Sequence, residues 1–352
     1  MSETNSDDPG ELPPITYVWQ TPIRKPRRSP WDFPGKGGPK RLSSEARAKL
    51  ERIVSCAPEV MVKITGRTKD VGHLKSHLEY ITRNGELAAE TEQGAVLAGR
   101  QGLRDLQERW TDDVTLDDRR RANATLSINM ILSMPPGTDP IKVRDAVRAF
   151  ATDTFEGRHD YVFVMHQDDE HPHVHLTVRS LGYNGRRLNP RKADLHHWRE
   201  CFASELRLRG IAAEATPRRT RGKIRKADRG KLRAMKERGS VPRVERLARE
   251  EVVHEAVSGT KAERPWEEKI RARQQTIRRR YLELAAELVQ SGDPRETALG
   301  HQVERFVRGM PGLATRRHDL RQELSAFARE MEQAKSRLAD QDGPDRDRDQ
   351  DR

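Results

Sequence analysis

The chain has 352 residues, of which 34% are hydrophobic and 35% are charged. A single apolar core cannot extend over that whole length, so we expect one catalytic domain with helical or disordered flanks. The formal net charge of +12 favours a polyanionic partner, nucleic acid above all, although a solubilising surface would carry the same charge.

The two cysteines, Cys56 and Cys201, exclude a disulfide scaffold, and neither has a C-x-x-C neighbour that would indicate a cysteine-ligated zinc site. No apolar run approaches the roughly 20 residues that a membrane span needs, so we expect no membrane insertion. The first residues, MSETNSDDPGELPP, lack the apolar centre of a signal peptide. The sequence therefore predicts a soluble protein made in a reducing cytoplasm.

Residues 1–42 are rich in proline, glycine, serine and charge, which predicts a disordered arm. Its basic segment TPIRKPRRSP is suited to contacts with phosphates, and a simple linker is the alternative. Ser43 is a candidate N-cap for a short helix with the sequence SEARAKLERIV. We expect the catalytic domain to extend over residues 43–226.

Strand and helix patterns alternate through this domain. Period-two alternation predicts a strand over Val60–Thr65, and a stripe of apolar residues predicts a helix over Asp70–Thr82 that ends at Asn84-Gly85. Further patterns predict strand Thr125–Leu132, helix Pro140–Phe155, strands Tyr161–His166 and His173–Val178, and helix Asp194–Leu208. This order indicates an α+β fold, an antiparallel sheet flanked by helices, and not a doubly wound sheet.

The chain becomes strongly basic after Thr216, and residues 227–345 are predicted to form a helical C-terminal region. Two long helices are expected there. One carries the stripe Ile270, Ile277, Tyr281, Leu284 and Leu288, and the other the heptad-like stripe Leu320, Leu324, Phe327, Met331, Ala334 and Leu338. Such a pair fits a hairpin or a dimer contact, with intramolecular packing as the simpler explanation. Residues 346–352 are predicted to be a disordered charged tail.

Four histidines lie within ten residues, in the run His166-Gln-Asp168-Asp-Glu-His171-Pro-His173-Val-His175. Side chains at i and i+2 of a strand share a face, so His173 and His175 point the same way, and His166 ends the preceding strand. Three converging imidazoles predict an open site for a divalent metal, Mg²⁺ or Mn²⁺, with Zn²⁺ as an alternative. Asp168 and His171 are candidates for orienting these ligands. A pH-sensitive histidine cluster or chance enrichment would be the alternatives.

Tyr80 lies on the predicted helix Asp70–Thr82, about 140° from the centre of its apolar stripe. Taken alone, such a position is typical of a surface tyrosine. Beside a three-histidine metal site in a basic protein, a nucleophile becomes the stronger interpretation, because a phenol attacks phosphorus once a cation neutralises the phosphate.

Several segments together resemble the relaxase and mobilisation-nuclease family, most closely its P-class, T-DNA-border-nicking (VirD-type) members. They are LEYITRNG, SMPPGTDP, HQDDEHPHVHLTVRS and LNPRKADLHHWRECFASELRLRGIAAEATPRRTRG. The resemblance covers roughly Val60 to Lys226, with three motifs in order, and His173-Val-His175 matches the signature of the wider HUH superfamily. It implies a five-stranded antiparallel sheet of ferredoxin-like descent.

The resemblance also implies roles for individual residues. Tyr80 matches the family nucleophile, His166, His173 and His175 match the metal ligands, and Ser133 matches a residue that contacts DNA near the cleaved phosphate, although it equally suits a turn. From their charge and position we expect further contacts with single-stranded DNA at Arg83, Arg187, Arg191, Arg218, Arg219 and Arg221, with Trp198 stacking on a base.

The expected activity is nicking of one strand of supercoiled DNA at a transfer origin, which leaves a 5′-phosphotyrosine and a free 3′-hydroxyl that can later be rejoined. The family implies accessory DNA-binding proteins, a type IV coupling protein, and export with the bound strand from the bacterial cytoplasm. No GxxxxGK[ST] loop of a helicase is present. The alternatives are an HUH-type rolling-circle replication initiator, a non-catalytic DNA-binding accessory protein, and a zinc-dependent hydrolase of small substrates.

Overall fold

The structure, a computed structural model, describes residues 42–116, 121, 123–168, 170–224, 228, 230–259 and 264–341. It divides the chain into two compact units between Pro217 and Arg218, earlier than the predicted domain end at Lys226. The predicted N-terminal arm, apart from Leu42, and the predicted charged tail lie outside the described residues.

The N-terminal unit contains one antiparallel sheet with the strand order β1-β4-β6-β5-β2-β3, which confirms the predicted α+β class. The sheet has six strands and not the five that the resemblance implied. The segment between α3 and β4 supplies the short hairpin β2–β3 and the helix α4, none of which the sequence patterns predicted. The elements of this unit are α2 (Ser44–Val54), β1 (Met61–Thr68), α3 (Val71–Thr82), β2 (Ala89–Thr91), β3 (Val96–Leu97), α4 (Gly99–Leu116), β4 (Ser127–Ser133), α5 (Pro140–Phe155), β5 (Tyr161–His166), β6 (His173–Arg179) and α6 (Lys192–Leu208).

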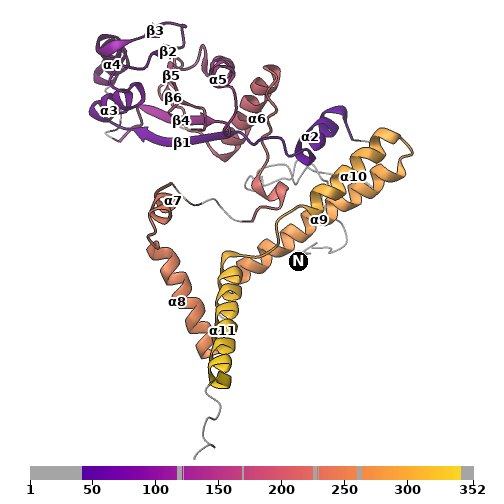
Figure 1. The fold of residues 1–352 in the computed structure, drawn as a ribbon. Helices are drawn as coiled ribbons and strands as arrows, with labels where there is room; N and C mark the ends of the chain where they lie inside the picture. The colour runs from indigo at the N-terminus through magenta and orange to yellow at the C-terminus, as the bar shows by residue number, and fades with distance from the viewer. Residues whose placement is uncertain are drawn as a thin grey trace, which may run out of the picture. The chain divides into compact units, whose positions relative to one another are not determined.

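Helices cover both faces of the sheet, with α3 and α4 on one side and α5 and α6 on the other (Figure 1). Successive residues of each strand face opposite sides, so Val174, Leu176 and Val178 of β6 point into the larger core with α5 and α6. The intervening residues His173, His175 and Thr177 therefore face the α3 side. This alternation gives the sheet one apolar face and one face on which polar side chains gather.

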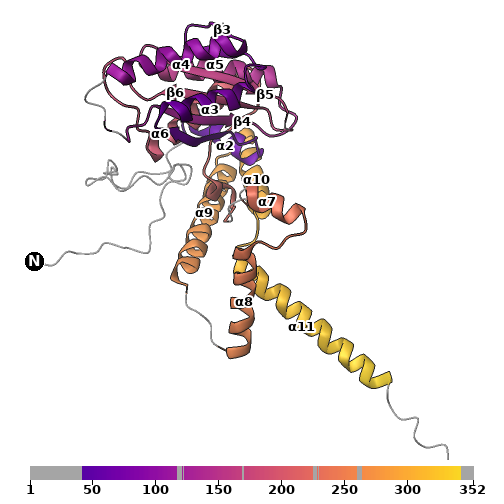
Figure 2. The same ribbon diagram turned by 90° about the vertical axis from the view of Figure 1, so that its left-hand side faces the viewer.

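Helix α3 packs on that second face through Leu74, Leu78 and Ile81, which meet Val162 and Val164 of β5. Asp70 caps its start by accepting a hydrogen bond from the backbone N–H of His73 at 2.7 Å. Figure 2 views the unit from this side, with α3 in front of the strands. The predicted helix is therefore present, and its apolar stripe is buried as expected.

The end of α3 is a tight left-handed turn. Arg83, Asn84 and Gly85 all have positive φ, and the value at Gly85 is +94°. Gly85 also lies against Gly99, where α4 begins: a Cβ on Gly85 would come within 2.7 Å of the Gly99 carbonyl carbon. The N–H of Gly99 donates to the Gly85 carbonyl at 3.1 Å. The turn and the start of α4 together fix the end of α3 at Thr82, two residues after Tyr80.

The C-terminal unit is helical, as predicted. It contains η1 (Arg218–Arg221), α7 (Gly230–Glu237), α8 (Arg243–Ser258), α9 (Pro265–Gln290), α10 (Pro294–Arg308) and α11 (Arg316–Gln341). A hairpin between the long helices α9 and α11, one of the arrangements that their stripes allowed, is not formed. Helix α9 instead forms a hairpin with α10, in which Tyr281 meets Phe306, and α11 packs on α8 through ion pairs of Arg317 and Arg321 with Glu255. Among the described residues, none of the helices has the length and apolar character needed to cross a bilayer.

Candidate active site

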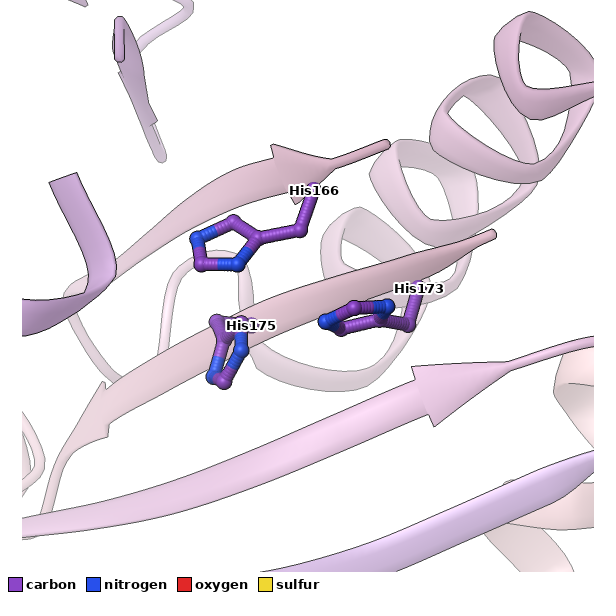
Figure 3. Close-up of side chains that lie close together, drawn as sticks. All are labelled: His166, His173 and His175. Carbon is purple, nitrogen blue, oxygen red and sulfur yellow. The ribbon is translucent and has the colours of Figure 1, made fainter. Parts of the chain in front are cut away.

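Three imidazoles converge on the α3 side of the sheet. His166 ends β5, while His173 and His175 begin β6, and the register pairs His166 with His173 across the two strands (Figure 3). The ring centroids of His166 and His175 are 4.4 Å apart, and His173 lies 5.3 Å from each. One ring nitrogen from each residue lies within 4.8 Å of the others. The antiparallel pairing of β5 and β6 thus brings together histidines from before and after the acidic loop that joins these strands.

Hydrogen bonds to backbone carbonyls fix which nitrogen of two rings carries the proton. His166 Nε2 donates to the Ile81 carbonyl at 2.6 Å, and His173 Nδ1 donates to the His171 carbonyl at 2.9 Å. Because a carbonyl only accepts, the other nitrogens, His166 Nδ1 and His173 Nε2, keep free lone pairs. Metal-binding histidines characteristically donate their second N–H in this way, which orients the ring and raises its basicity.

The three residues suit a divalent metal ion. Two nitrogens that bind one cation at about 2.1 Å lie at most about 4.2 Å apart, so the observed cluster needs only small side-chain rotations to reach that geometry. His175 is 5% exposed, and burial, followed by the neighbouring His166 and His173, lowers the pKa of His175 to about 3. His175 is therefore neutral at physiological pH, as a metal ligand must be. Among the described residues, this is the group of histidine, cysteine and carboxylate side chains arranged to hold an ion.

Tyr80 lies beside this cluster. It is in the last turn of α3, its side chain is 68% exposed, and its ring meets His175 edge to face with centroids 6.0 Å apart. An exposed aromatic side chain that points away from the apolar stripe of its own helix leaves the phenol open to a large substrate. The structure thus places a potential nucleophile next to a potential metal site, although Tyr80 and His175 are far apart in the sequence.

Sequence reasoning missed His77, which connects α3 to the strand that carries two of the imidazoles. His77 Nε2 lies 2.9 Å from Thr177 Oγ1 on β6. Burial, and then the nearby His73, lower the pKa of His77 to about 4. The available signal was spacing: His73, His77 and Tyr80 follow at i, i+4 and i+7 along one flank of the helix, and Thr177 follows His175 by two residues.

The low pKa of His77 predicts a pH-dependent stability. Between pH 6.5 and about 4, the unfolded chain binds a proton at His77 that the folded chain does not, so stability falls as the pH falls through this window. His77 contributes at most about 1.4 kcal/mol per pH unit to that loss. Urea unfolding of metal-free protein at pH 7, 6 and 5 measures this effect. The free energy of unfolding should fall less steeply with falling pH for His77→Gln than for the parent. Equal slopes would contradict a buried neutral His77.

The acidic loop and the end of β4 complete the surroundings of the imidazoles. Asp168 Oδ1 lies 3.8 Å from His166 Nδ1, and its other oxygen pairs with Arg83 at 2.5 Å. The Ile81 carbonyl, and not Asp168, therefore makes the close contact that orients His166. The contact of His171 with His173 likewise comes from its backbone carbonyl. Ser133 is 5% exposed and lies opposite His173 in the β4–β6 register, so it borders the site.

Two other arginines of the N-terminal unit that were expected to contact DNA, Arg187 and Arg191, are not gathered at this site. Arg187 donates to the Thr125 carbonyl, near the opposite ends of β4 and β6. Arg191 is the N-cap of α6, on the other side of the sheet. Arg218, Arg219 and Arg221 form η1 in the C-terminal unit.

Trp198, which was expected to stack on a base of the DNA, is buried. It is 5% exposed and belongs to the core between the sheet and α5 and α6, where its ring centroid lies 5.5 Å from that of Phe155. A buried indole on the face opposite the imidazoles cannot stack on a nucleobase, so the predicted role of Trp198 in DNA binding is wrong.

A comparison with protein families finds a match to this region. A family model described as "Relaxase: MobA/VirD2-like, nuclease domain" matches residues 80–208. The matched segment begins at Tyr80 and includes His166, His173 and His175. It also contains the strands β4, β5 and β6 that form the middle of the sheet.

Curated relatives agree with this match. The T-DNA border endonuclease VirD2 of Rhizobium radiobacter is 31% identical over 187 residues, which are 47% of this chain and 43% of that protein. VirD2 of Agrobacterium fabrum is 28% identical over 184 residues, 47% of this chain and 41% of that protein. The chain thus spans less than half the length of these relatives. A chain from a solved structure described as "Molecular Basis of Vancomycin Resistance Transfer in Staphylococcus aureus" aligns over 46% of this chain and 99% of its own length, with 14% identity and a TM-score of 0.31.

Proposed function

We propose that this protein is a DNA relaxase that uses Tyr80 to nick one strand at a transfer origin, because residues 80–208 match the family model of MobA/VirD2-like relaxase nuclease domains and the chain is similar to T-DNA border endonucleases. The observation that carries the proposal is the contact between Tyr80 and His175, with ring centroids 6.0 Å apart, at the edge of a three-imidazole cluster. A nucleophile and a metal site in contact are what cleavage of a phosphodiester by a tyrosine needs.

The phenol oxygen of Tyr80 attacks phosphorus in line with the leaving 3′ oxygen. The phenol loses its proton, the bond between phosphorus and the 3′ oxygen breaks, and the 3′ oxygen takes up a proton. The products are a 5′-phosphotyrosyl diester and a free 3′-hydroxyl. Since one phosphodiester replaces another, attack by a 3′-hydroxyl on the phosphotyrosine rejoins the strand. Helix α3 carries a single tyrosine, which suits one nick followed by one later rejoining.

His166 Nδ1, His173 Nε2 and one nitrogen of His175 would hold a divalent cation, Mg²⁺ or Mn²⁺ in our proposal, with Zn²⁺ as the alternative. When bound, the cation neutralises charge on a non-bridging phosphate oxygen. The protein itself orients two of these rings through the carbonyls of Ile81 and His171. Burial keeps His175 neutral and ready to bind.

The surface around Tyr80 suits a macromolecular substrate. The phenol is exposed, the chain carries a net charge of +12, and Arg83 lies directly after the helix that carries the nucleophile. By analogy with the T-DNA border endonucleases that it resembles, we propose that the substrate is single-stranded or supercoiled DNA at a transfer origin. Accessory DNA-binding proteins and a type IV coupling protein would be its partners, and a bacterial cytoplasm its place of action before export with the strand.

Incubation with supercoiled plasmid that bears the cognate transfer origin tests this function. With Mg²⁺ or Mn²⁺ present, denaturation by detergent should convert part of the plasmid to open circles with protein attached to the 5′ end of the nick. Digestion of the adduct should identify a peptide that contains Tyr80. Nicked DNA that carries a free 5′ phosphate and no protein would instead indicate a hydrolytic nuclease, and this result would contradict the proposal.

A further inference from the structure

Helix α3 is connected to the sheet by two hydrogen bonds between polar groups in addition to its apolar contacts. The Ile81 carbonyl accepts from His166 Nε2 at 2.6 Å, and His77 Nε2 lies 2.9 Å from Thr177 Oγ1. His166 belongs to β5 and Thr177 to β6, so the two bonds join the helix to both strands that carry the imidazoles. Tyr80 lies between the two connecting residues of the helix.

The bond to Ile81 holds the C-terminal end of α3. The last carbonyls of a helix lack N–H partners within the helix. In the turn that follows, the N–H groups of Arg83, Asn84 and Gly85 donate to Tyr80, Glu79 and Thr82, respectively. The His166 imidazole thus supplies the donor for the carbonyl of Ile81. This contact fixes the end of the helix but acts on its backbone, close to the helix axis.

The bond from His77 acts on the flank of the helix. His77 precedes Tyr80 by three residues, so both side chains leave the helix on the same side. Their partners Thr177 and His175 are two residues apart on one face of β6. The contact of His77 with Thr177 therefore lies about one helical turn from the contact of Tyr80 with His175.

The contact of His77 with Thr177 and the contact of Tyr80 with His175 lie along one flank of α3, and two such contacts determine how far a helix is rotated about its axis. Leu74, Leu78 and Ile81 hold α3 against the sheet, but apolar contacts are non-directional and tolerate small rotations. At a side-chain radius of about 6 Å, a rotation of about 10° moves the phenol by about 1 Å. A displacement of that size at a reacting centre costs about 10²-fold in rate.

We propose that His77 and Thr177 are positioning residues for the nucleophile: their hydrogen bond sets the rotation of α3 that presents Tyr80 to the imidazole cluster. The inference rests on the proposed function, since it concerns how well Tyr80 is aligned for attack. Neither residue touches the reacting atoms or binds the cation.

The test uses paired variants of the full-length protein. His77→Ala and Thr177→Val remove the bond, whereas His77→Gln keeps an Nε2 donor and Thr177→Ser keeps the hydroxyl. Removal should lower kcat for cleavage of a single-stranded origin oligonucleotide by about 10- to 100-fold, with KM and Mn²⁺ affinity by calorimetry within about twofold of the parent. The conservative variants should recover most of kcat, and the double variant His77→Ala/Thr177→Val should be no slower than either single one.

His73→Ala is the matched control, because His73 is an exposed histidine one turn earlier on the same flank. It should cleave like the parent. The proposal is overturned if His77→Ala keeps the parental kcat, if His77→Gln is as impaired as His77→Ala, or if KM and Mn²⁺ affinity deteriorate together with kcat. The last result would show that His77 merely supports the fold of the whole site.

Hydrogen exchange provides a readout that does not depend on cleavage. Backbone amides of residues 74–82 should exchange faster in His77→Ala and Thr177→Val than in the parent, and at the parental rate in His77→Gln. Unchanged exchange in all variants would contradict the positioning role even in a protein that cleaves normally. If the parent forms no adduct with DNA while exchange responds as expected, the proposed function fails and the hydrogen bond still holds α3.

Discussion

Tyr80→Phe is expected to abolish the covalent adduct between protein and DNA and to lower strand cleavage by at least about 10³-fold. The substitution removes only the phenol oxygen, and the remaining ring can keep its edge-to-face contact with His175. Because Tyr80 is 68% exposed, the free energy of unfolding should change little. Cleavage of an origin oligonucleotide, analysed on denaturing gels for attached protein, measures the effect.

Tyr183→Phe is the matched control for this experiment. Tyr183 is also an exposed tyrosine of the N-terminal unit, but its hydroxyl donates to Asp160 at 2.6 Å, and burial and this contact raise the pKa of Tyr183. Such a phenol is a poor nucleophile, so its loss should leave adduct formation intact. A Tyr80→Phe protein that still becomes attached to DNA would show that another residue carries the reaction. Parental affinity of Tyr80→Phe for Mn²⁺ would show that its defect is chemical.

His173→Ala is expected to weaken Mn²⁺ binding and to lower cleavage by about 10²-fold or more, since two imidazoles hold a cation far less firmly than three. His173 is preferred to His166, because removal of His166 would take the donor from the Ile81 carbonyl in the helix that carries Tyr80, whereas His173 donates to the His171 carbonyl in the loop. Calorimetric titration of chelator-treated protein with Mn²⁺ measures binding, and cleavage over a range of Mn²⁺ concentrations measures activity.

His197→Ala, on α6 at the other side of the sheet, serves as the control. It should bind Mn²⁺ and cleave like the parent. Cleavage by His173→Ala that is unimpaired and retains the parental dependence on Mn²⁺ would remove the imidazole cluster from the mechanism. Partial recovery of His173→Ala at high Mn²⁺ concentration would instead support it, because mass action compensates for a weakened site.

The sequence predicted the elements in the middle of the domain because each has a long and regular pattern. The helix Pro140–Phe155 and the strand Tyr161–His166 have the predicted bounds, and the observed α3 begins one residue after the predicted Asp70, which caps it. The hairpin β2–β3 was not predicted, because strands of three and two residues are too short to show a period. Helix α10 was missed as well, so the hairpin that α9 forms with it was not predicted.

Some features of the candidate site could likewise be predicted from the sequence, and others could not. That His173 and His175 share a face follows from the two-residue period of a strand alone. The exposure of Trp198 does not follow from its position, because the same amphipathic helix can place an aromatic residue in the core or at its margin. The structure places this indole in the core and so removes it from the predicted DNA surface.

The sequence by itself determined the order of β1, α3, β4, α5, β5, β6 and α6, the shared face of His173 and His175, and the position of Tyr80 outside the apolar stripe of its helix. These are consequences of backbone periodicity, which acts over a few neighbouring residues. Only the tertiary structure decided that Tyr80 meets His175, that the Ile81 carbonyl orients His166, and that His77 meets Thr177. The residues of each pair are separated by at least 85 positions in the chain, and the packing of α3 on the sheet brings them together.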